Sequence, residues 1–355
     1  MVSIAQLVRA SDCGSEGRGF DPHCSPHQAA RVQARAVLLC MSQDNKVKGR
    51  FAPSPTGRMH LGNVFSALLS WLSARSRGGK WLLRIEDLDP QRSRREYALQ
   101  IEDDLRWLGL DWDEGGTEER GDNGPYCQSL RGEIYEDILR HLRATGMTYP
   151  CYCSRADLKA TQAPHQSDGR VIYPGTCRPA RFPAPWKEPC LPFSERIAVA
   201  DSRIDFTDGV FGPQSVWLAD HCGDFVLRRA DGAWAYQLAV VADDALMGVT
   251  EVVRGSDLLL SAAQQIYLFR MLGYEPPRYL HVPLLCNSQG VRLSKRDKSL
   301  SLGELRQRYG SPEPVIGRLA FLAGLTETPA PVAASDLISR FDPDRIPRSE
   351  SIVAE

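Results

Sequence analysis

Residues suited to binding a phosphate gather between positions 50 and 63, where a proline-rich turn leads into a helix. The segment reads Arg50-Phe51-Ala52-Pro53-Ser54-Pro55-Thr56-Gly57 and soon continues as His60-Leu61-Gly62-Asn63. A helix N-terminus presents unpaired amides and the positive end of the helix dipole, which together suit a phosphate. His60 can add a hydrogen-bond donor, and Gly62 lets a flat base approach the backbone. Alone, the string fits a helix start with a surface histidine equally well.

A second candidate is the basic pentapeptide Arg292-Leu293-Ser294-Lys295-Arg296. On a flexible loop, Lys295 can neutralise the negative charge that develops when a nucleophile displaces pyrophosphate. An isolated basic run of this length is more often a solvated surface. Its meaning therefore depends on the motifs that accompany it.

A cluster typical of metal ligands follows in the middle of the chain, where Cys151-Tyr152-Cys153 precedes Tyr173 and Cys177. Structural zinc favours four ligands, mostly thiolates, so three cysteines leave one position open. The phenolate oxygen of Tyr173 can fill it, and His165 is the rival by chemistry. The remaining alternative is a set of buried free thiols without metal.

The pattern around the phosphate-binding turn predicts alternating strands and helices. Residues 46–52 and 80–85 have the character of short strands, and residues 61–75 and 94–108 carry apolar positions at helical spacing. Strand, helix, strand, helix predicts an α/β fold with a doubly wound parallel sheet.

The rest of the chain changes character twice. Residues 150–220 are rich in proline, cysteine and aspartate and are interpreted as an insertion between two halves of the sheet. The α/β pattern resumes at 236–247, and a further helix is predicted at 261–272. A short apolar helix is expected at 320–325, and the stretch from about 330 onward is expected to carry little core.

Composition excludes several classes of protein. The 355 residues include 43 Lys plus Arg and 44 Asp plus Glu, which gives a net charge of -1, and 43% are hydrophobic. A wholly disordered chain is therefore excluded, and so is a protein that binds nucleic acid through a positive charge spread over its whole surface. A membrane-spanning helix is not expected, since no run of 18 apolar residues occurs. Ten cysteines in a chain of this size, without a convincing signal peptide, favour a reducing cytoplasm.

Residues 1–40 differ from the remainder and are expected to be a non-native or disordered extension. Their four arginines are interrupted by acidic residues, which argues against a transit peptide. Gly19-Phe20-Asp21-Pro22 can be encoded by a string that resembles the T-arm of a tRNA gene. We therefore expect out-of-frame translation of an upstream tRNA gene and a true start at Met41, which N-terminal sequencing of the native protein would test.

Together, the phosphate-binding segment at 50–63 and the basic pentapeptide at 292–296 resemble the two signatures of class I aminoacyl-tRNA synthetases. The longer strings RFAPSPTGRMHLGN and RIEDLDP narrow the resemblance to the glutamyl-tRNA synthetase family, and it extends from about residue 49 to residue 302. Tyr236, Asp243-Asp244 and Arg254-Gly255-Ser256-Asp257 fit the same family. Two departures are Asn63, where many class I enzymes have a second histidine, and the Arg-Leu-Ser-Lys-Arg form of the second signature.

The resemblance implies a Rossmann-like class I catalytic domain divided by a zinc-bearing insertion. Its first half is expected at 41–150, the insertion at 151–220 and the second half at 221–290. The signature loop and a short helical tail are expected at 291–355, with no anticodon-binding domain, because so short a tail cannot build a core of its own.

The resemblance also implies the site residues. Glutamate has two carboxylates and one ammonium, so a matching pocket needs two cations and one anion; an alternative interpretation makes Arg84 and Glu86 a surface ion pair. The implied glutamate-binding residues are Arg50, Ala52, Ser54, Glu86, Tyr236 and Arg254. The implied ATP-binding residues are His60, Gly62, Asn63 and Lys295, of which His60 and Lys295 are catalytic. The implied zinc ligands are Cys151, Cys153, Tyr173 and Cys177.

The short tail is similar to that of the glutamyl-queuosine tRNA(Asp) synthetases, the truncated relatives in this family. They imply tRNA-independent activation of L-glutamate with ATP and Mg²⁺, followed by transfer to queuosine in the anticodon of tRNA(Asp), by a cytoplasmic monomer with one structural Zn²⁺. The alternatives are a truncated enzyme that charges the 3′ end of tRNA(Glu), a silent glutamate- or tRNA-binding paralogue, and a nucleotidyl transferase for another small acid.

Overall fold

The computed structural model describes residues 46–160, 172–187, 189, 192–199, 203–293 and 301–354. The expectations for residues 1–40, His165 and Lys295 fall outside these ranges. None of the helices in the described part is both long and apolar enough to cross a membrane.

The first half of the predicted α/β domain contains a parallel sheet with the order β1-β2-β3. Its strands are β1 (Lys48–Phe51), β2 (Lys80–Leu83) and β3 (Glu114–Gly115), in parallel register. Helix α3 (Leu61–Arg75) connects β1 to β2, and α4 (Arg95–Trp107) connects β2 to β3. The predicted helices and strands are therefore present, within a few residues of their expected bounds.

The second half places another parallel pair beside β1. Helix α8 (Tyr236–Leu246) leads into β9 (Glu251–Gly255), and α9 (Leu259–Met271) connects β9 to its parallel partner β10 (Arg278–Val282). Just before β9, the Thr250 N–H donates to the Lys48 carbonyl at 2.9 Å. The strand order therefore reverses between β1 and β9, and at such a switch point the carboxyl ends of the strands open a crevice for ligands. The doubly wound sheet is confirmed.

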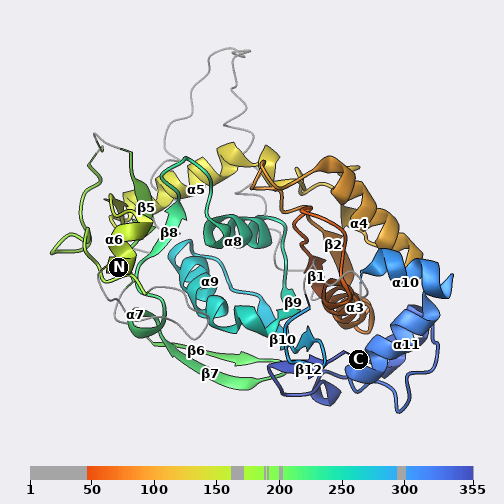
Figure 1. The fold of residues 1–355 in the computed structure, drawn as a ribbon. Coiled ribbons are helices and arrows are strands. Elements are labelled where there is room, and N and C mark those ends of the chain that lie inside the picture. Colours follow the sequence, from red (N-terminus) through yellow and green to blue (C-terminus); the bar gives the residue numbers. More distant parts are fainter. Residues whose placement is uncertain are drawn as a thin grey trace, which may run out of the picture. The chain divides into compact units, whose positions relative to one another are not determined.

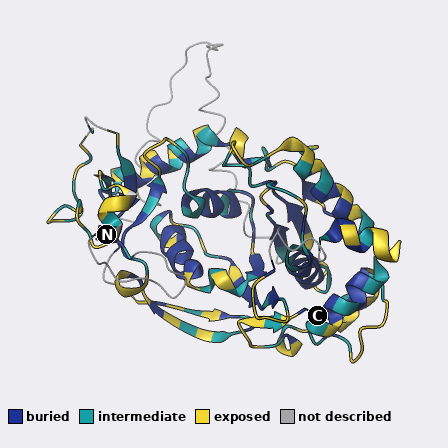
Figure 2. Cartoon of the chain, viewed as in Figure 1, coloured by how far each residue is buried: buried dark blue, intermediate teal, exposed yellow. Residues whose placement is uncertain are grey.

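Helix α3 is the central helix of the first half. Apolar side chains cover most of its circumference, and Figure 2 shows it almost entirely buried. Fully burying one leucine or phenylalanine contributes about 1.5–3 kcal/mol, so packing on several sides fixes this helix firmly. Its N-terminus is thereby held at the carboxyl end of β1.

Between residues 148 and 228 the chain forms antiparallel structure. Strands β4 (Thr148–Cys151), β5 (Ser194–Ile197) and β8 (Phe225–Arg228) pair in that order. Strands β6 (Arg203–Asp208) and β7 (Gly212–Trp217) form a separate hairpin. The surrounding helices are α5 (Gly132–Ala144), α6 (Arg155–Ala160) and α7 (Leu218–His221).

The C-terminal part corrects two expectations. Helix α11 (Glu313–Leu322) begins earlier than the helix expected at 320–325, and it is preceded by α10 (Leu302–Tyr309). In Figure 1, α10 lies beside α4, and Arg306 pairs there with Asp104 at 2.9 Å.

The expectation of little core beyond residue 330 is wrong. Leu337 and Ile346 are buried in the core around α3. Strand β12 (Ser351–Val353) pairs in parallel with β11 (Leu284–Cys286). The buried residues lie in and after 3₁₀ segments, η5 (Ala334–Arg340) and η6 (Pro343–Arg345), which lack the helical period that sequence patterns reveal.

Candidate active site

A cleft of about 480 Å³ opens at the switch point between β1 and β9. The start of α3 and the first residue of α8 border it. The residues assigned to glutamate or ATP that line it are Arg50, Ala52, Ser54, His60, Gly62, Asn63, Glu86, Tyr236 and Arg254. The fold thus brings together residues as far apart in the sequence as Arg50 and Arg254, although their individual roles remain predictions.

His60 caps helix α3 at the edge of the cleft. Its Nδ1 accepts from the Gly62 N–H at 3.1 Å, and the Asn63 Oδ1 accepts from the His60 N–H at 3.2 Å. Because Nδ1 accepts, the neutral ring carries its proton on Nε2, which suits a phosphate oxygen. A Cβ at Gly62 would lie 3.0 Å from the His60 ring, so the glycine makes room for this cap.

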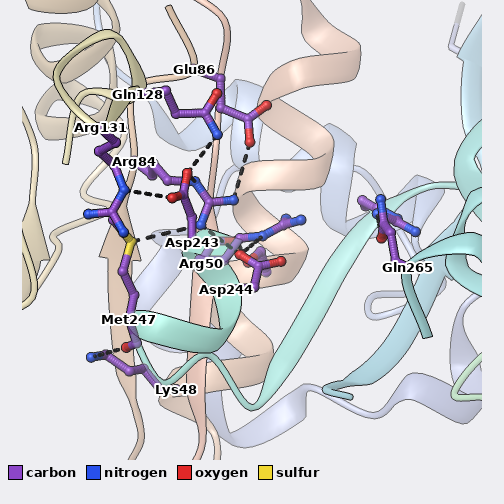
Figure 3. Close-up of polar contacts among 12 residues, drawn as sticks. Lys48, Arg50, Arg84, Glu86, Gln128, Arg131, Asp243, Asp244, Met247 and Gln265 are labelled. Carbon is purple, nitrogen blue, oxygen red and sulfur yellow. Dashed lines mark hydrogen bonds and ion pairs between the residues drawn. The ribbon is translucent and has the colours of Figure 1, made fainter. Parts of the chain in front are cut away.

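Arg84, Glu86 and Asp244 form a buried charge cluster beneath the cleft (Figure 3). Arg84 is fully buried and donates to Asp244 Oδ1 at 2.6 Å and to Glu86 Oε1 at 3.2 Å. The Arg50 Nε lies 3.5 Å from the same Asp244 oxygen. Arg84 and Glu86 are therefore paired, but the interpretation of a surface ion pair is wrong, because only 9% of the Glu86 side chain is exposed.

The neighbouring carboxylate, Asp243, is a second anchor. It accepts from Arg131 Nε at 2.6 Å, from Gln128 Nε2 at 2.8 Å and from the Tyr135 hydroxyl at 2.9 Å. Gln128 belongs to the short 3₁₀ helix η2 (Gln128–Leu130). These bonds join α5 and η2 to the C-terminal half of α8, the helix whose first residue, Tyr236, lines the cleft.

Burial shapes the titration of the groups that face the cleft. The pKa of Glu86 is raised by burial, and the positive charges of Arg84 and Arg50 oppose that shift. The pKa of Tyr236 is raised by burial and by the charge of Glu86, so its hydroxyl remains a donor. Glu86 is thus a carboxylate whose ionised form depends on nearby cations.

Arg254 is fixed by hydrogen bonds to residues that do not belong to the sequence motifs. Its Nε donates to His281 Nε2 at 3.0 Å and its Nη1 to Gln265 Oε1 at 2.7 Å. The His281 Nδ1 lies 2.6 Å from Asp208 Oδ2. Asp208 lies at the end of β6, far from every recognised motif, and only its position in the fold reveals it.

The first two residues of the second signature line the cleft, and the segment after the signature contacts His60. Arg292 and Leu293 line it, and Arg292 pairs with Asp257 at 2.7 Å, just after the carboxyl end of β9. On the other flank, Ser301 forms an antiparallel bridge with His60. Asp257 belongs to the 3₁₀ helix η3 (Ser256–Leu258). Lys295 itself lies outside the described residues.

The three predicted cysteine ligands come together at a separate place, near the end of β4. The Sγ atoms of Cys151, Cys153 and Cys177 all lie within 4.8 Å of one another. The Tyr173 oxygen lies 3.4 Å from Cys151 Sγ and 3.9 Å from Cys153 Sγ. Three converging thiols with an oxygen beside them fit the donor set of a four-coordinate metal site.

Comparisons with known proteins agree with this geometry. A family described as tRNA synthetases class I (E and Q), catalytic domain, matches residues 46–352. The chain is 53% identical to the Glutamyl-Q tRNA(Asp) synthetase of Symbiobacterium thermophilum, across 84% of this chain and 94% of that relative. It is 47% identical to the protein of the same name from Nitratidesulfovibrio vulgaris, across 85% and 94%. The solved glutamate-tRNA synthetase of Elizabethkingia anophelis is similar with a TM-score of 0.71 and 28% identity, across 86% of this chain and 67% of that one.

Proposed function

Because the chain belongs to the class I (E and Q) tRNA synthetase family, we propose that it activates L-glutamate with ATP, without tRNA, and transfers the glutamate to queuosine in the anticodon of tRNA(Asp). The observation that carries the proposal is one cleft in which two arginines, one carboxylate and a capped helix N-terminus meet. Two curated relatives, matched over 94% of their length, bear the name of this activity.

The cleft complements the charges of glutamate. Arg50 and Arg254 take the two carboxylates, since a planar guanidinium bonds a carboxylate through two parallel hydrogen bonds. Glu86 takes the ammonium; Arg84 occupies its Oε1, and a carboxylate has further acceptor sites. Tyr236 is a hydrogen-bond donor beside it, and Ser54 is a donor on the turn after β1. This set favours a dicarboxylic amino acid over other small acids.

The first step forms glutamyl-adenylate. An oxygen of the glutamate α-carboxylate attacks the α-phosphorus of ATP, the bond to the bridging oxygen breaks, and its electron pair leaves on pyrophosphate. His60 and the first amides of α3 hold the phosphate oxygens, with Gly62 and Asn63 in that turn. Lys295 neutralises the developing charge, and ATP enters as its Mg²⁺ complex, in which the ion neutralises phosphate charge.

The second step transfers the glutamyl group. A hydroxyl of the queuosine cyclopentene ring attacks the carbonyl carbon of the adenylate, an ester bond forms and AMP leaves. Proteins recognise an RNA stem chiefly through its shape and backbone, so a local basic patch suffices. The patch around the second signature comprises Arg292, Lys295, Arg296 and Lys298.

The runner-up is an enzyme that charges the 3′ end of tRNA(Glu), and the names of the two closely matched relatives favour the queuosine acceptor. A silent binding paralogue would be free to lose members of the cleft, whereas Arg50, His60, Glu86, Tyr236 and Arg254 are all present there.

The cysteine cluster holds a structural zinc ion in this proposal. Cys151, Cys153 and Cys177 supply three thiolates and Tyr173 the fourth ligand; when bound, the zinc ties β4 to the segment that carries Cys177. The described cysteines form no disulfide bond, which supports a reducing cytoplasm. We also propose that the enzyme acts as a monomer, which light scattering would test.

The activation half of the proposal is tested by pyrophosphate exchange into ATP without tRNA, with glutamate, glutamine and aspartate as separate substrates. Exchange with glutamate alone is expected. Exchange with none of them would favour the silent paralogue, and exchange with another acid would assign the cleft to that substrate.

A further inference from the structure

We infer that His281 and Asp208 are positioning residues for glutamate, which act by fixing the orientation of Arg254. The inference rests on the proposed function, because it takes Arg254 as a ligand of a glutamate carboxylate. Neither residue lines the cleft, and neither belongs to a recognised motif.

The first observation is how the Arg254 guanidinium is used. It carries five N–H groups. Nε donates to His281 Nε2 at 3.0 Å, Nη1 to Gln265 Oε1 at 2.7 Å and Nη2 to the Leu258 carbonyl at 3.2 Å. One N–H therefore remains on each terminal nitrogen for the substrate, and a carboxylate bonds a guanidinium through paired N–H groups. The protein thus fixes the guanidinium through three hydrogen bonds and leaves two N–H groups for the substrate.

The second observation fixes the tautomer of His281. Its Nε2 faces a guanidinium N–H, so Nε2 must accept and the proton must be on Nδ1. Nδ1 then donates to Asp208 Oδ2 at 2.6 Å. The other oxygen of Asp208 accepts from the amides of Val210 at 3.0 Å and Phe211 at 2.9 Å, so the carboxylate is itself fixed by the β6–β7 turn.

The third observation is that His281 stays neutral. Burial and the nearby charge of Arg254 lower its pKa to about 4, although Asp208 opposes the shift. The charged and titratable groups close to it are Arg254, Asp208 and Tyr279, whose ring stacks on it with centroids 6.0 Å apart. The pKa of Tyr279 is raised by burial, so at neutral pH its hydroxyl is uncharged. The acceptor at Nε2 is therefore preserved at neutral pH.

Tyr279 also fixes the plane of the guanidinium. The Cζ atom of Arg254 lies 5.0 Å from the centroid of the Tyr279 ring. The ring limits tilting of the guanidinium, and the His281 bond limits rotation within its plane. Loss of the bond would leave the charge of Arg254 in place but misalign its paired donors, and small misplacements of a binding group are costly.

The test uses substitutions that nearly preserve side-chain size, so that a change in the tautomer of His281 is separated from a change in packing. In Asp208→Asn the new amide can donate to His281 Nδ1, which forces the proton onto Nε2 and sets two donors against each other at Arg254. The KM for glutamate is expected to rise about 10- to 100-fold in pyrophosphate exchange, the scale of losing a hydrogen bond to a charged group. The KM for ATP is expected to stay within about threefold of wild type.

Two substitutions at 281 give a matched pair. His281→Gln places an acceptor at the former Nε2 position and is expected to keep the KM for glutamate within about fivefold of wild type. His281→Asn is too short to reach Arg254 and is expected to behave like Asp208→Asn. The double variant Asp208→Asn, His281→Gln has no imidazole at 281 and therefore no tautomer to invert. Its KM for glutamate should match that of His281→Gln.

A spectroscopic readout needs no active variant. In ¹⁵N-histidine-labelled wild-type protein, the His281 resonances, identified by their loss in His281→Gln, should show an unprotonated Nε2 and a protonated Nδ1. A protonated Nε2 in the wild type would overturn the inference. So would folded Asp208→Asn and His281→Asn variants that keep the wild-type KM for glutamate, or an equal rise in both KM values. Failure of the proposed function would differ, since wild-type protein would then show no glutamate-dependent exchange while the tautomer remained as stated.

Discussion

The Arg84 guanidinium donates to Asp244 Oδ1 at 2.6 Å inside the protein, directly beneath the cleft. The same guanidinium holds Glu86, so one buried cation organises two anions from different halves of the fold. Removing one member of such a cluster leaves uncompensated buried charge, which costs about 3–5 kcal/mol.

Arg84→Gln is therefore expected to lower the free energy of unfolding by about 3–5 kcal/mol, measured by urea denaturation. The matched control is Arg140→Gln, which removes an exposed arginine paired with Asp137 on α5. Exposed pairs contribute little, so the control should unfold near the wild-type midpoint. Equal midpoints for the two variants would show that the Arg84 cluster does not stabilise the fold.

His60 combines a structural and a catalytic role, and two substitutions separate them. His60→Asn keeps a side-chain oxygen that can cap α3 but removes the ring donor, so stability should hold while the rate of pyrophosphate exchange falls about 10²- to 10³-fold. His60→Ala should lose the same activity and, in addition, about 1 kcal/mol of stability. Wild-type exchange in a folded His60→Asn variant would remove His60 from the phosphate site.

The raised pKa of Glu86 predicts a dependence of glutamate binding on pH. The ammonium of the substrate needs the ionised carboxylate, and a raised pKa means that protonation begins at a higher pH than for an ordinary glutamate. The KM for glutamate should therefore rise as pH falls through that pKa, and level off above it.

Glu86→Gln should raise the KM for glutamate about 10- to 100-fold and remove the acid-side rise that is due to this group. The control is Asp87→Asn, whose carboxylate bonds Ser129 instead of facing the cleft. Steady-state pyrophosphate exchange across pH checks both. The same acid-side rise in wild type and Glu86→Gln would assign the titration to the substrate or to another residue.

The metal proposal predicts about one zinc per chain in the purified protein, measured by elemental analysis. Cys177→Ser should abolish the zinc content and lower the unfolding temperature, and Tyr173→Phe should weaken zinc retention against a chelator. Cys222→Ser is the control, since Cys222 lies outside the cluster. Zinc-free protein with full thermal stability would show that the cluster is a set of packed thiols.

Much of the fold and of the cleft could be predicted from the sequence, because the motif residues lie next to helices and strands that have clear apolar patterns. Helix α3 follows the predicted range from Leu61 to Arg75, since its apolar spacing is strong and His60 marks its start. The cleft residues were predicted from the resemblance to the glutamyl-tRNA synthetase family, whose motifs in this chain lie largely near the carboxyl ends of β1, β2 and β9.

Other features had no local signal. Asp208 and His281 are 73 residues apart and meet only because β6 packs beside β10. Leu337 and Ile346 enter the core from 3₁₀ segments, whose spacing resembles neither helix nor strand. Such contacts depend on tertiary packing, which a pattern along one segment does not contain.

The most direct test of the central claim is charging with radiolabelled glutamate and ATP. The acceptors are tRNA(Asp) that carries queuosine, tRNA(Asp) that lacks it, and tRNA(Glu). Label on the queuosine-containing tRNA(Asp) alone is the expected result. Label on the 3′ end of tRNA(Glu), with none on queuosine-containing tRNA(Asp), would contradict the account and assign the chain to ordinary glutamyl-tRNA synthesis.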